Sequence, residues 1–124
     1  MKTERPVYLS LTQFSWTFTA IASIVHRITG AVLFAGIGYL LWLLDMALES
    51  TAGFTAAAEV LSAPLAKIAL IALLAALLYH LIAGIKHMFM DFGVGESFAT
   101  AKLNAALTFA LTAITTAMVG VWLW

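Results

Sequence analysis

Three long apolar runs limit most strongly what this chain can fold into. They extend over about residues 18–44, 64–90 and 101–124. A helix needs about 20 apolar residues to cross the roughly 30 Å hydrocarbon core of a bilayer, so each run is long enough to span it with some tilt. Their only charged side chains are Arg27, Lys67, Lys86 and Lys102. We therefore predict an all-α integral membrane protein with three transmembrane helices.

The composition agrees with a membrane location and excludes several kinds of chemistry. Hydrophobic residues make up 64% of the 124 residues and charged residues 10%, whereas soluble domains are close to half apolar and about a quarter charged. The 6 basic side chains equal the 6 acidic ones in number, so no excess charge indicates a nucleic-acid partner. The absence of cysteine excludes disulfides, thiolate metal sites, iron–sulfur ligation and cysteine nucleophiles within the chain.

The basic side chains predict the orientation of the helices. A polar connection at residues 45–63 joins the first two runs, and a short glycine-containing link at residues 91–100 joins the last two. Lys67 alone falls on the side of the first connection, and the opposite side carries Lys2, Arg5, Arg27, Lys86 and Lys102. The positive-inside rule then places the N-terminus and the second link in the cytoplasm. Because the N-terminal stretch lacks the apolar core of a cleavable signal peptide, we expect a multi-pass protein of a bacterial inner membrane.

Two parts make up the domain organisation that we expect. In residues 1–17, Val7, Leu9 and Leu11 alternate with Tyr, Ser and Thr. A period of two is typical of an extended segment, so this part is expected to lie in the cytoplasm against soluble subunits. Residues 18–124 are expected to form a single transmembrane domain. Its alanine-rich and glycine-containing helices permit close packing, which indicates a place in a multi-subunit helical bundle.

The stretch YHLIAGIKHMFMDFG, which begins at Tyr79, places polar groups at defined depths in the second run. His80, Gly84 and His87 follow each other at intervals that put all three on one helix face. An imidazole in hydrocarbon is costly without a partner, so His80 beside a small residue indicates a functional site. A structural role stays open, in which His80 bonds to a neighbouring helix.

A second constellation, SIVHRITG, begins at Ser23 near the same end of the first run. Ser23 and Arg27 are one helical turn apart and share a face. If the first helix enters the membrane near residue 20 and the second leaves near residue 90, His26 lies about 9 Å deep, His87 about 5 Å and His80 about 15 Å, at 1.5 Å per residue. The two constellations therefore overlap in depth on the cytoplasmic side.

This arrangement suits an amphipathic redox cofactor. Imidazole nitrogen is a common axial ligand of haem iron, and the two propionates of a porphyrin need cations or donors near the membrane surface. His80 would bind the iron, and Gly84 would let the porphyrin approach the backbone. The propionates would be met by Arg27, His26 and His87. The depth difference of about 6 Å disfavours His26 as a second iron ligand, so we expect that ligand from a partner subunit.

Other roles stay open for the same side chains. Arg27 could snorkel to lipid phosphate, and the Ser23 hydroxyl could bond back to its own helix. The chain could be a haem-free structural anchor, or a proton or ion conduit in which His26, His80 and His87 act as relay groups. No acidic or histidine residue continues such a relay through the outer leaflet.

Three segments resemble the signature segments of the cytochrome b membrane-anchor subunit of bacterial and mitochondrial succinate dehydrogenase. They are RPVYLSL at Arg5–Leu11, SIVHRITG at Ser23–Gly30 and HLIAGIKHMFMDFG at His80–Gly93. The motifs S-x-x-H-R-x-[ST]-G and H-x-x-x-G-[IV]-[KR]-H-[LM]-x-x-D are highly specific in combination. The resemblance covers nearly the whole chain.

The resemblance implies a subunit of succinate dehydrogenase, an enzyme of the respiratory chain and the tricarboxylic acid cycle. In that family a second small membrane-anchor subunit shares one haem b, and the two anchor a flavoprotein subunit and an iron–sulfur subunit. Electrons pass from succinate through flavin and iron–sulfur clusters to ubiquinone. A fumarate reductase anchor, working in the opposite direction, is the nearest alternative.

The resemblance also implies roles for individual residues of this chain. His80 corresponds to the axial ligand of the haem iron. Ser23 and Arg27 match positions at the ubiquinone site, and His26 and Arg27 match positions near the haem propionates. His87 belongs to the second motif, and contact with a propionate is one of its implied roles.

Overall fold

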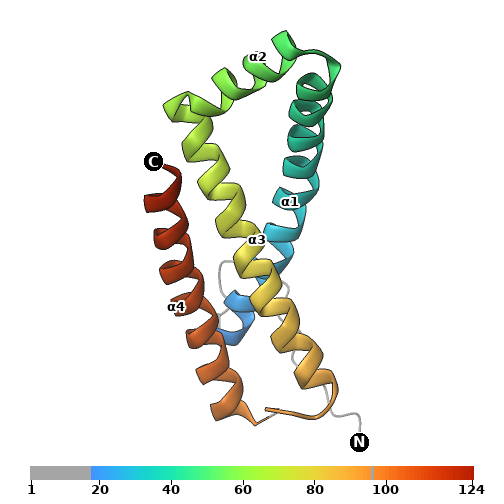
Figure 1. Cartoon of the computed structure of the whole chain (residues 1–124). Coiled ribbons are helices and arrows are strands. Elements are labelled where there is room, and N and C mark those ends of the chain that lie inside the picture. The colour runs from blue at the N-terminus through green and yellow to red at the C-terminus, as the bar shows by residue number, and fades with distance from the viewer. Residues whose placement is uncertain (1–17, 96) are drawn as a thin grey trace, which may run out of the picture.

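The structure, a computed structural model, describes residues 18–95 and 97–124 and is all-helical over this part (Figure 1). The predicted extended segment lies outside the described residues. The helices are α1 Phe18–Glu49, α2 Thr51–Ser62, α3 Pro64–Asp91 and α4 Phe98–Leu123. Among them, 3 are long and apolar enough to cross a membrane, namely α1, α3 and α4. The predicted fold class, an all-α membrane protein with three spanning helices, is confirmed.

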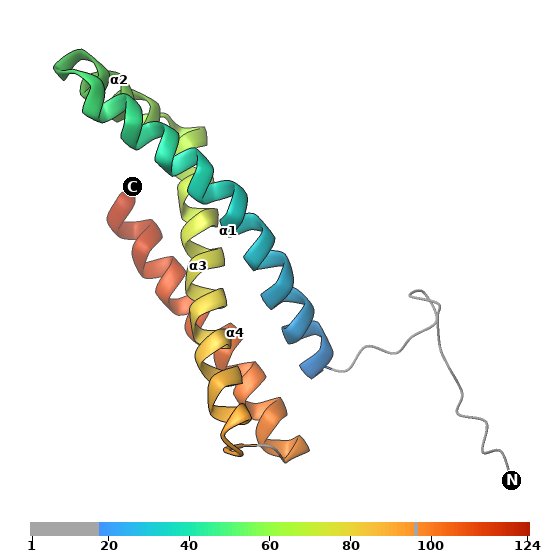
Figure 2. The ribbon, with the colours of Figure 1, turned by 90° about the vertical axis from the view of Figure 1, so that its right-hand side faces the viewer.

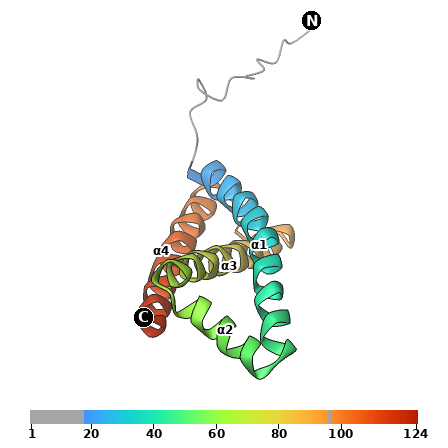
Figure 3. The ribbon, with the colours of Figure 1, turned by 90° about the horizontal axis from the view of Figure 1, so that it is seen from above.

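The connection between the first two spans differs from the prediction, because it is helical. The first span continues beyond residue 44 to Glu49, and α2 follows after a single residue. The Ser50 side chain caps α2 by accepting a hydrogen bond from the Gly53 amide at 3.0 Å. Pro64 stands in the first turn of α3, where its missing N–H costs nothing. The short helix α2 bridges the ends of α1 and α3 (Figures 1 and 3).

The last span also begins earlier than the predicted residue 101. The Ser97 side chain caps α4 by accepting a hydrogen bond from the Thr100 amide at 3.3 Å. The chain reverses before this cap at Gly93 and Gly95, whose φ angles are 82° and 76°. These left-handed conformations favour glycine, so the link between α3 and α4 can be short.

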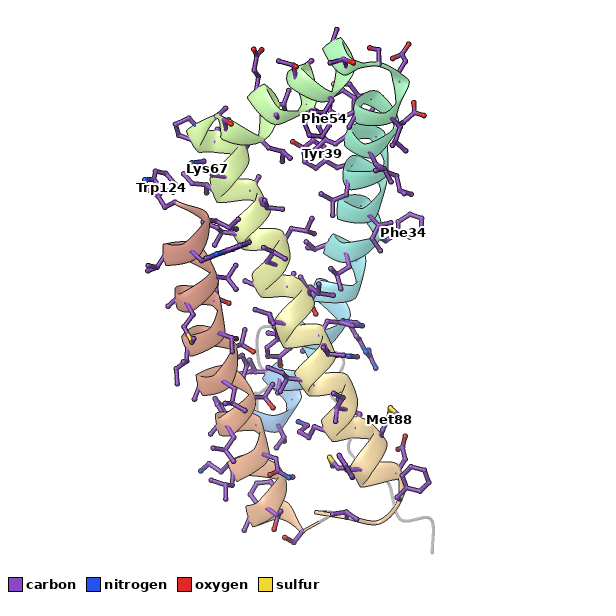
Figure 4. All side chains as sticks on the ribbon, viewed as in Figure 1. Phe34, Tyr39, Phe54, Lys67, Met88 and Trp124 are labelled. Carbon is purple, nitrogen blue, oxygen red and sulfur yellow. The ribbon has the colours of Figure 1, made fainter. Side chains whose placement is uncertain are left out.

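Small residues let the spans approach closely. Ala22 of α1, Ala83 of α3 and Ala105 of α4 are all buried, with exposed fractions of 2%, 1% and 0%. The spans α1 and α3 are inclined to each other, as Figures 1 and 2 show. Most large apolar side chains point outward, as Phe34 does in Figure 4, with 86% of its surface exposed. Such an apolar exterior suits lipid or the helices of partner subunits.

The two ends of α3 and α4 that lie near α2 are joined by an aromatic contact. The Lys67 ammonium lies 5.6 Å from the ring centroid of Trp124 (Figure 4). A cation at this distance is attracted to the face of an indole ring. The contact therefore ties the end of α4 to the first turns of α3.

We expect Ala105→Leu to destabilise the packing of α4, because the larger side chain has no space at a fully buried position. Overpacking of this kind costs about 1–3 kcal/mol. Thermal unfolding of the detergent-solubilised complex measures the loss. The matched control is Ala106→Leu at the adjacent exposed position, and equal midpoints for the two variants would contradict the packing described here.

Candidate functional site: a histidine cluster between two spans

The imidazoles of His26, His80 and His87 form one cluster between α1 and α3. The rings of His26 and His80 stack with centroids 4.0 Å apart and an interplanar angle of 11°. The ring of His87 lies 5.4 Å from that of His26 at 58°. All three side chains are half-buried. The structure thus brings together three of the five predicted site residues.

The predicted depth difference between His26 and His80 is wrong. Two rings with centroids 4.0 Å apart differ in depth by at most that distance, whereas counting residues from each helix end placed them about 6 Å apart. The count assumed parallel helices and fixed entry points. The helices α1 and α3 are inclined to each other (Figure 2), so counts along the two chains do not give relative depth, and the two rings stack.

Each of the two stacked histidines lies opposite a glycine of the other helix. A Cβ atom on Gly30 of α1 would lie 3.1 Å from Cε1 of His80, and a Cβ on Gly84 of α3 would lie 3.6 Å from Nε2 of His26. We expected Gly84 to admit a porphyrin to the backbone, but the His26 imidazole occupies this space. The lack of a side chain at Gly30 therefore makes room for His80, whereas a Cβ atom at Gly84 would be in ordinary contact with His26.

Hydrogen bonds determine which nitrogen of His80 carries the proton. Nδ1 of His80 lies 3.0 Å from the backbone oxygen of His26 and 3.2 Å from Oγ1 of Thr29. A carbonyl oxygen only accepts, so Nδ1 must be the protonated nitrogen and the donor. In the neutral ring, Nε2 then keeps a free lone pair. Metal-binding histidines have this arrangement, with one nitrogen donating to a carbonyl and the other facing the metal.

The cluster also holds a polar atom without a partner. Nε2 of His26 is buried and has no hydrogen-bond partner within the part of the chain that the structure describes. An unpaired buried polar group costs roughly 1–3 kcal/mol. Nε2 of His26 is therefore an unsatisfied polar atom within the cluster.

Tyr79 was not predicted to be part of the site, although it adjoins His80 in sequence. Its hydroxyl donates to the backbone oxygen of Ala22 at 2.6 Å, and its ring lies 5.2 Å from that of Phe109 on α4. Tyr79 is 3% exposed. Tyr79 and His80 of α3 thus form hydrogen bonds to two backbone carbonyls of α1 that are one turn apart. These two bonds fix the axial position of α3 relative to α1.

We expect Tyr79→Phe to lower the free energy of unfolding by about 1 kcal/mol, the usual net value of a hydrogen bond. The loss is moderate because a helical carbonyl such as that of Ala22 keeps its own i+4 amide donor. Chemical or thermal unfolding in detergent measures it. Tyr39→Phe on α1 is the control, since its hydroxyl makes no hydrogen bond among the described residues. A larger loss for the control would contradict this role of Tyr79.

The structure places the other two predicted site residues on α1 beside the cluster, not within it. Arg27 is exposed and Ser23 is half-buried. Lys86 of α3 lines a different hollow, a groove of about 420 Å³ between α3 and α4 that also contains Asn104 and Thr108. Ser23 and Arg27 thus remain accessible to a ligand or a partner at the margin of the cluster.

The described side chains fit an axial haem ligand better than a bare metal ion. No three His, Cys, Asp or Glu side chains in residues 18–95 and 97–124 converge as ligands of one ion. Haem iron needs only axial ligands from protein. His80 has its donor nitrogen engaged and its second nitrogen free, and the unpartnered His26 lies in contact with it. The donor set therefore suits haem.

Comparisons with known proteins relate the chain to one family. Residues 1–119 match the family described as Succinate dehydrogenase/Fumarate reductase transmembrane subunit. The chain is 38% identical to the succinate dehydrogenase cytochrome b556 subunit of Coxiella burnetii over 125 aligned positions that cover 100% of both chains. It is 41% identical to the subunit of that name from Paracoccus denitrificans over 92 positions, which cover 74% of this chain and 71% of the relative. The chain belongs to the succinate dehydrogenase/fumarate reductase transmembrane subunit family, as a member of its cytochrome b membrane-anchor subunits.

Proposed function

We propose that this membrane anchor of succinate dehydrogenase binds haem b through Nε2 of His80 and contributes Ser23 and Arg27 to the site where ubiquinone is reduced. The observation that carries the proposal is the hydrogen bond from Nδ1 of His80 to the backbone oxygen of His26 at 3.0 Å. It leaves Nε2 as a neutral donor atom, which is the form that binds iron.

A purely structural role for His80 accounts for less of the geometry. A histidine that only tied α3 to α1 would satisfy Nδ1 and leave Nε2 without a partner at membrane depth, where water cannot replace it. The neighbouring Nε2 of His26 would be a second unpaired atom at the same place. A cofactor whose metal is bound by Nε2 of His80 would give that atom a partner.

His26, His87 and Arg27 are the groups of this chain proposed to hold the propionates. The ring centroids of His26 and His87 lie 5.4 Å apart. Each imidazole can donate a hydrogen bond to a carboxylate. Arg27 is exposed beside them and always charged. Bound haem supplies one-electron storage next to the quinone site.

The second axial ligand is proposed to come from the second membrane-anchor subunit. The rings of His26 and His80 stack at 4.0 Å, which is van der Waals contact between carbon atoms. No porphyrin plane fits between two rings in contact, so the two histidines cannot bind opposite faces of one iron. In this proposal haem b would be held by this chain and the second membrane-anchor subunit together.

At the quinone site, Ser23 and Arg27 act by binding the carbonyl oxygens of ubiquinone. Reduction to the quinol takes two electrons, which arrive from the iron–sulfur subunit, and two protons. A hydroxyl donor and a guanidinium held at these oxygens stabilise negative charge as it develops there, as an oxyanion hole does. Dicarboxylate oxidation takes place in the flavoprotein subunit, so this chain is not catalytic alone.

The topology proposed for the complex follows from the same assignment. The cluster, Ser23 and Arg27 lie toward the end of the bundle where α3 and α4 are linked, and the positive-inside rule places this end in the cytoplasm of a bacterial cell. The flavoprotein and iron–sulfur subunits would dock there, with residues 1–17 against them, and residues 18–124 form the transmembrane domain in the inner membrane.

A difference spectrum of the purified wild-type complex tests the proposal. Dithionite-reduced minus oxidised samples should give the absorption bands of a b-type haem, with about one haem for each covalent or tightly bound flavin. Addition of succinate should reduce ubiquinone at a rate that is inhibited by quinone-site inhibitors. A fully assembled complex without haem absorption would overturn the assignment of His80.

A further inference from the structure

We propose that Thr29 is a positioning residue for His80, which fixes the imidazole in the Nδ1-protonated form and directs Nε2 toward the iron. The inference rests on the proposed binding of haem by His80. It names a residue that the sequence motifs contain without indicating a role, since the motif position accepts Ser or Thr.

The single hydroxyl hydrogen of Thr29 is already in use. Oγ1 of Thr29 donates to the backbone oxygen of His26 at 2.8 Å. The same Oγ1 lies 3.2 Å from Nδ1 of His80. Since the hydrogen points to the carbonyl, Oγ1 can only accept from His80. Nδ1 therefore shares its hydrogen between two acceptors on α1, the carbonyl of His26 and the hydroxyl of Thr29.

Two acceptors restrict the ring more than one does. A single acceptor holds Nδ1 along one direction only and tolerates small rotations of the imidazole about the Cβ–Cγ bond. Thr29 adds a second direction, while the His26 ring covers one face at 4.0 Å and Cε1 lies opposite Gly30, where a Cβ atom would be only 3.1 Å away. These contacts hold the plane of the ring, and with it the direction of Nε2, before any metal binds.

Thr29 also acts on the ligand electronically. A hydrogen bond accepted from the non-ligating nitrogen raises the basicity of the ligating nitrogen. A more basic imidazole stabilises ferric iron relative to ferrous iron. Thr29 is thus expected to lower the reduction potential of the haem and to increase the affinity for it.

The competing interpretation is that Thr29 only bonds back to its own helix. Threonines commonly do so in membrane helices, and α4 offers a matched example. Oγ1 of Thr112 donates to the backbone oxygen of Thr108 at 2.8 Å, without a histidine partner. Thr112→Val therefore reproduces the loss of a back-bonded hydroxyl and leaves His80 unaffected.

The test uses the assembled four-subunit complex and three variants, Thr29→Val, Thr29→Ser and Thr112→Val. The readouts are the haem midpoint potential from a redox titration and the ratio of haem to flavin after dilution in detergent. Thr29→Val, which is isosteric and lacks the acceptor, should weaken haem retention about 10-fold or more and raise the midpoint potential. Thr29→Ser and Thr112→Val should match the wild type in both.

Two results would overturn the inference. The first is a Thr29→Val complex that retains haem as the wild type does and has the same haem midpoint potential. The second is an equal change of these two quantities in Thr29→Val and Thr29→Ser, because serine keeps the hydroxyl. If the Thr29→Val complex does not assemble, Thr29→Ala can be measured in its place, because it removes the hydroxyl without putting a methyl group there. His80→Leu separates the two proposals: if it loses haem while Thr29→Val keeps it unchanged, His80 is the ligand and only the role of Thr29 fails.

Discussion

His80→Leu is expected to abolish haem binding by the complex while the protein subunits stay associated. Leucine keeps α3 apolar and similar in volume at this position, but it has no donor atom for iron. The lost hydrogen bond to the His26 carbonyl costs about 1 kcal/mol, which is too little to unfold the bundle. The dithionite difference spectrum and the haem-to-flavin ratio of the purified complex measure the effect.

His87→Leu is the matched control for this substitution. It removes an imidazole of the same cluster, whose ring lies 5.4 Å from that of His26, but not the proposed ligand. Because His26 and Arg27 remain to hold the propionates, its haem content should fall much less than that of His80→Leu. Wild-type haem content in His80→Leu, or loss of haem in His87→Leu alone, would assign the iron to a different residue.

Arg27→Leu is expected to lower the rate of ubiquinone reduction by succinate about 100-fold, the usual effect of removing one donor that stabilises developing negative charge. Ser23→Ala should act in the same direction. Succinate oxidation with a soluble artificial acceptor should change little, since that acceptor takes electrons before they reach the quinone. The ratio of the two activities is the measurement.

Two further variants test whether a change in the ratio of the two activities is specific to the guanidinium of Arg27. Arg27→Lys keeps the charge and loses the planar guanidinium, so its activity with ubiquinone should fall between those of Arg27→Leu and the wild type. Ser62→Ala removes a hydroxyl at the far end of the bundle, where it bonds back to Ala58 at 2.7 Å, and should have no effect. If Arg27→Leu lowered both activities equally in an intact complex, its place at the quinone site would be refuted.

The three spans could be predicted from the sequence because their apolar length alone decides them. The helix α2 could not, since residues 45–63 contain the acidic and small residues of a polar connection. Alanine favours helix, and Ser50 supplies the cap. A serine cap followed by an alanine-rich segment was the sequence signal that could have predicted α2.

The residues of the histidine cluster could be predicted from the sequence, but their arrangement in space could not. Spacing along α3 and along α1 identified His80, His87 and His26, because each helix has a regular period. Their relative depth depends on how α1 inclines to α3, which no local pattern encodes. Thr29 and Tyr79 were missed for a related reason, since threonine and tyrosine are common in membrane helices and only the approach of the other helix gives them partners.

The reciprocal placement of histidine and glycine has a consequence for sliding of one helix along the other. A shift of α3 by one helical turn along α1 would bring Arg27 or Phe34, each with a Cβ atom, toward the ring that now faces Gly30. A Cβ atom at Gly84 would lie 3.6 Å from Nε2 of His26, which is an ordinary contact. The contact of Gly30 with His80 therefore limits the axial position of the two helices, and a substitution that adds a Cβ atom at Gly30 requires the His80 ring to move by a few tenths of an ångström.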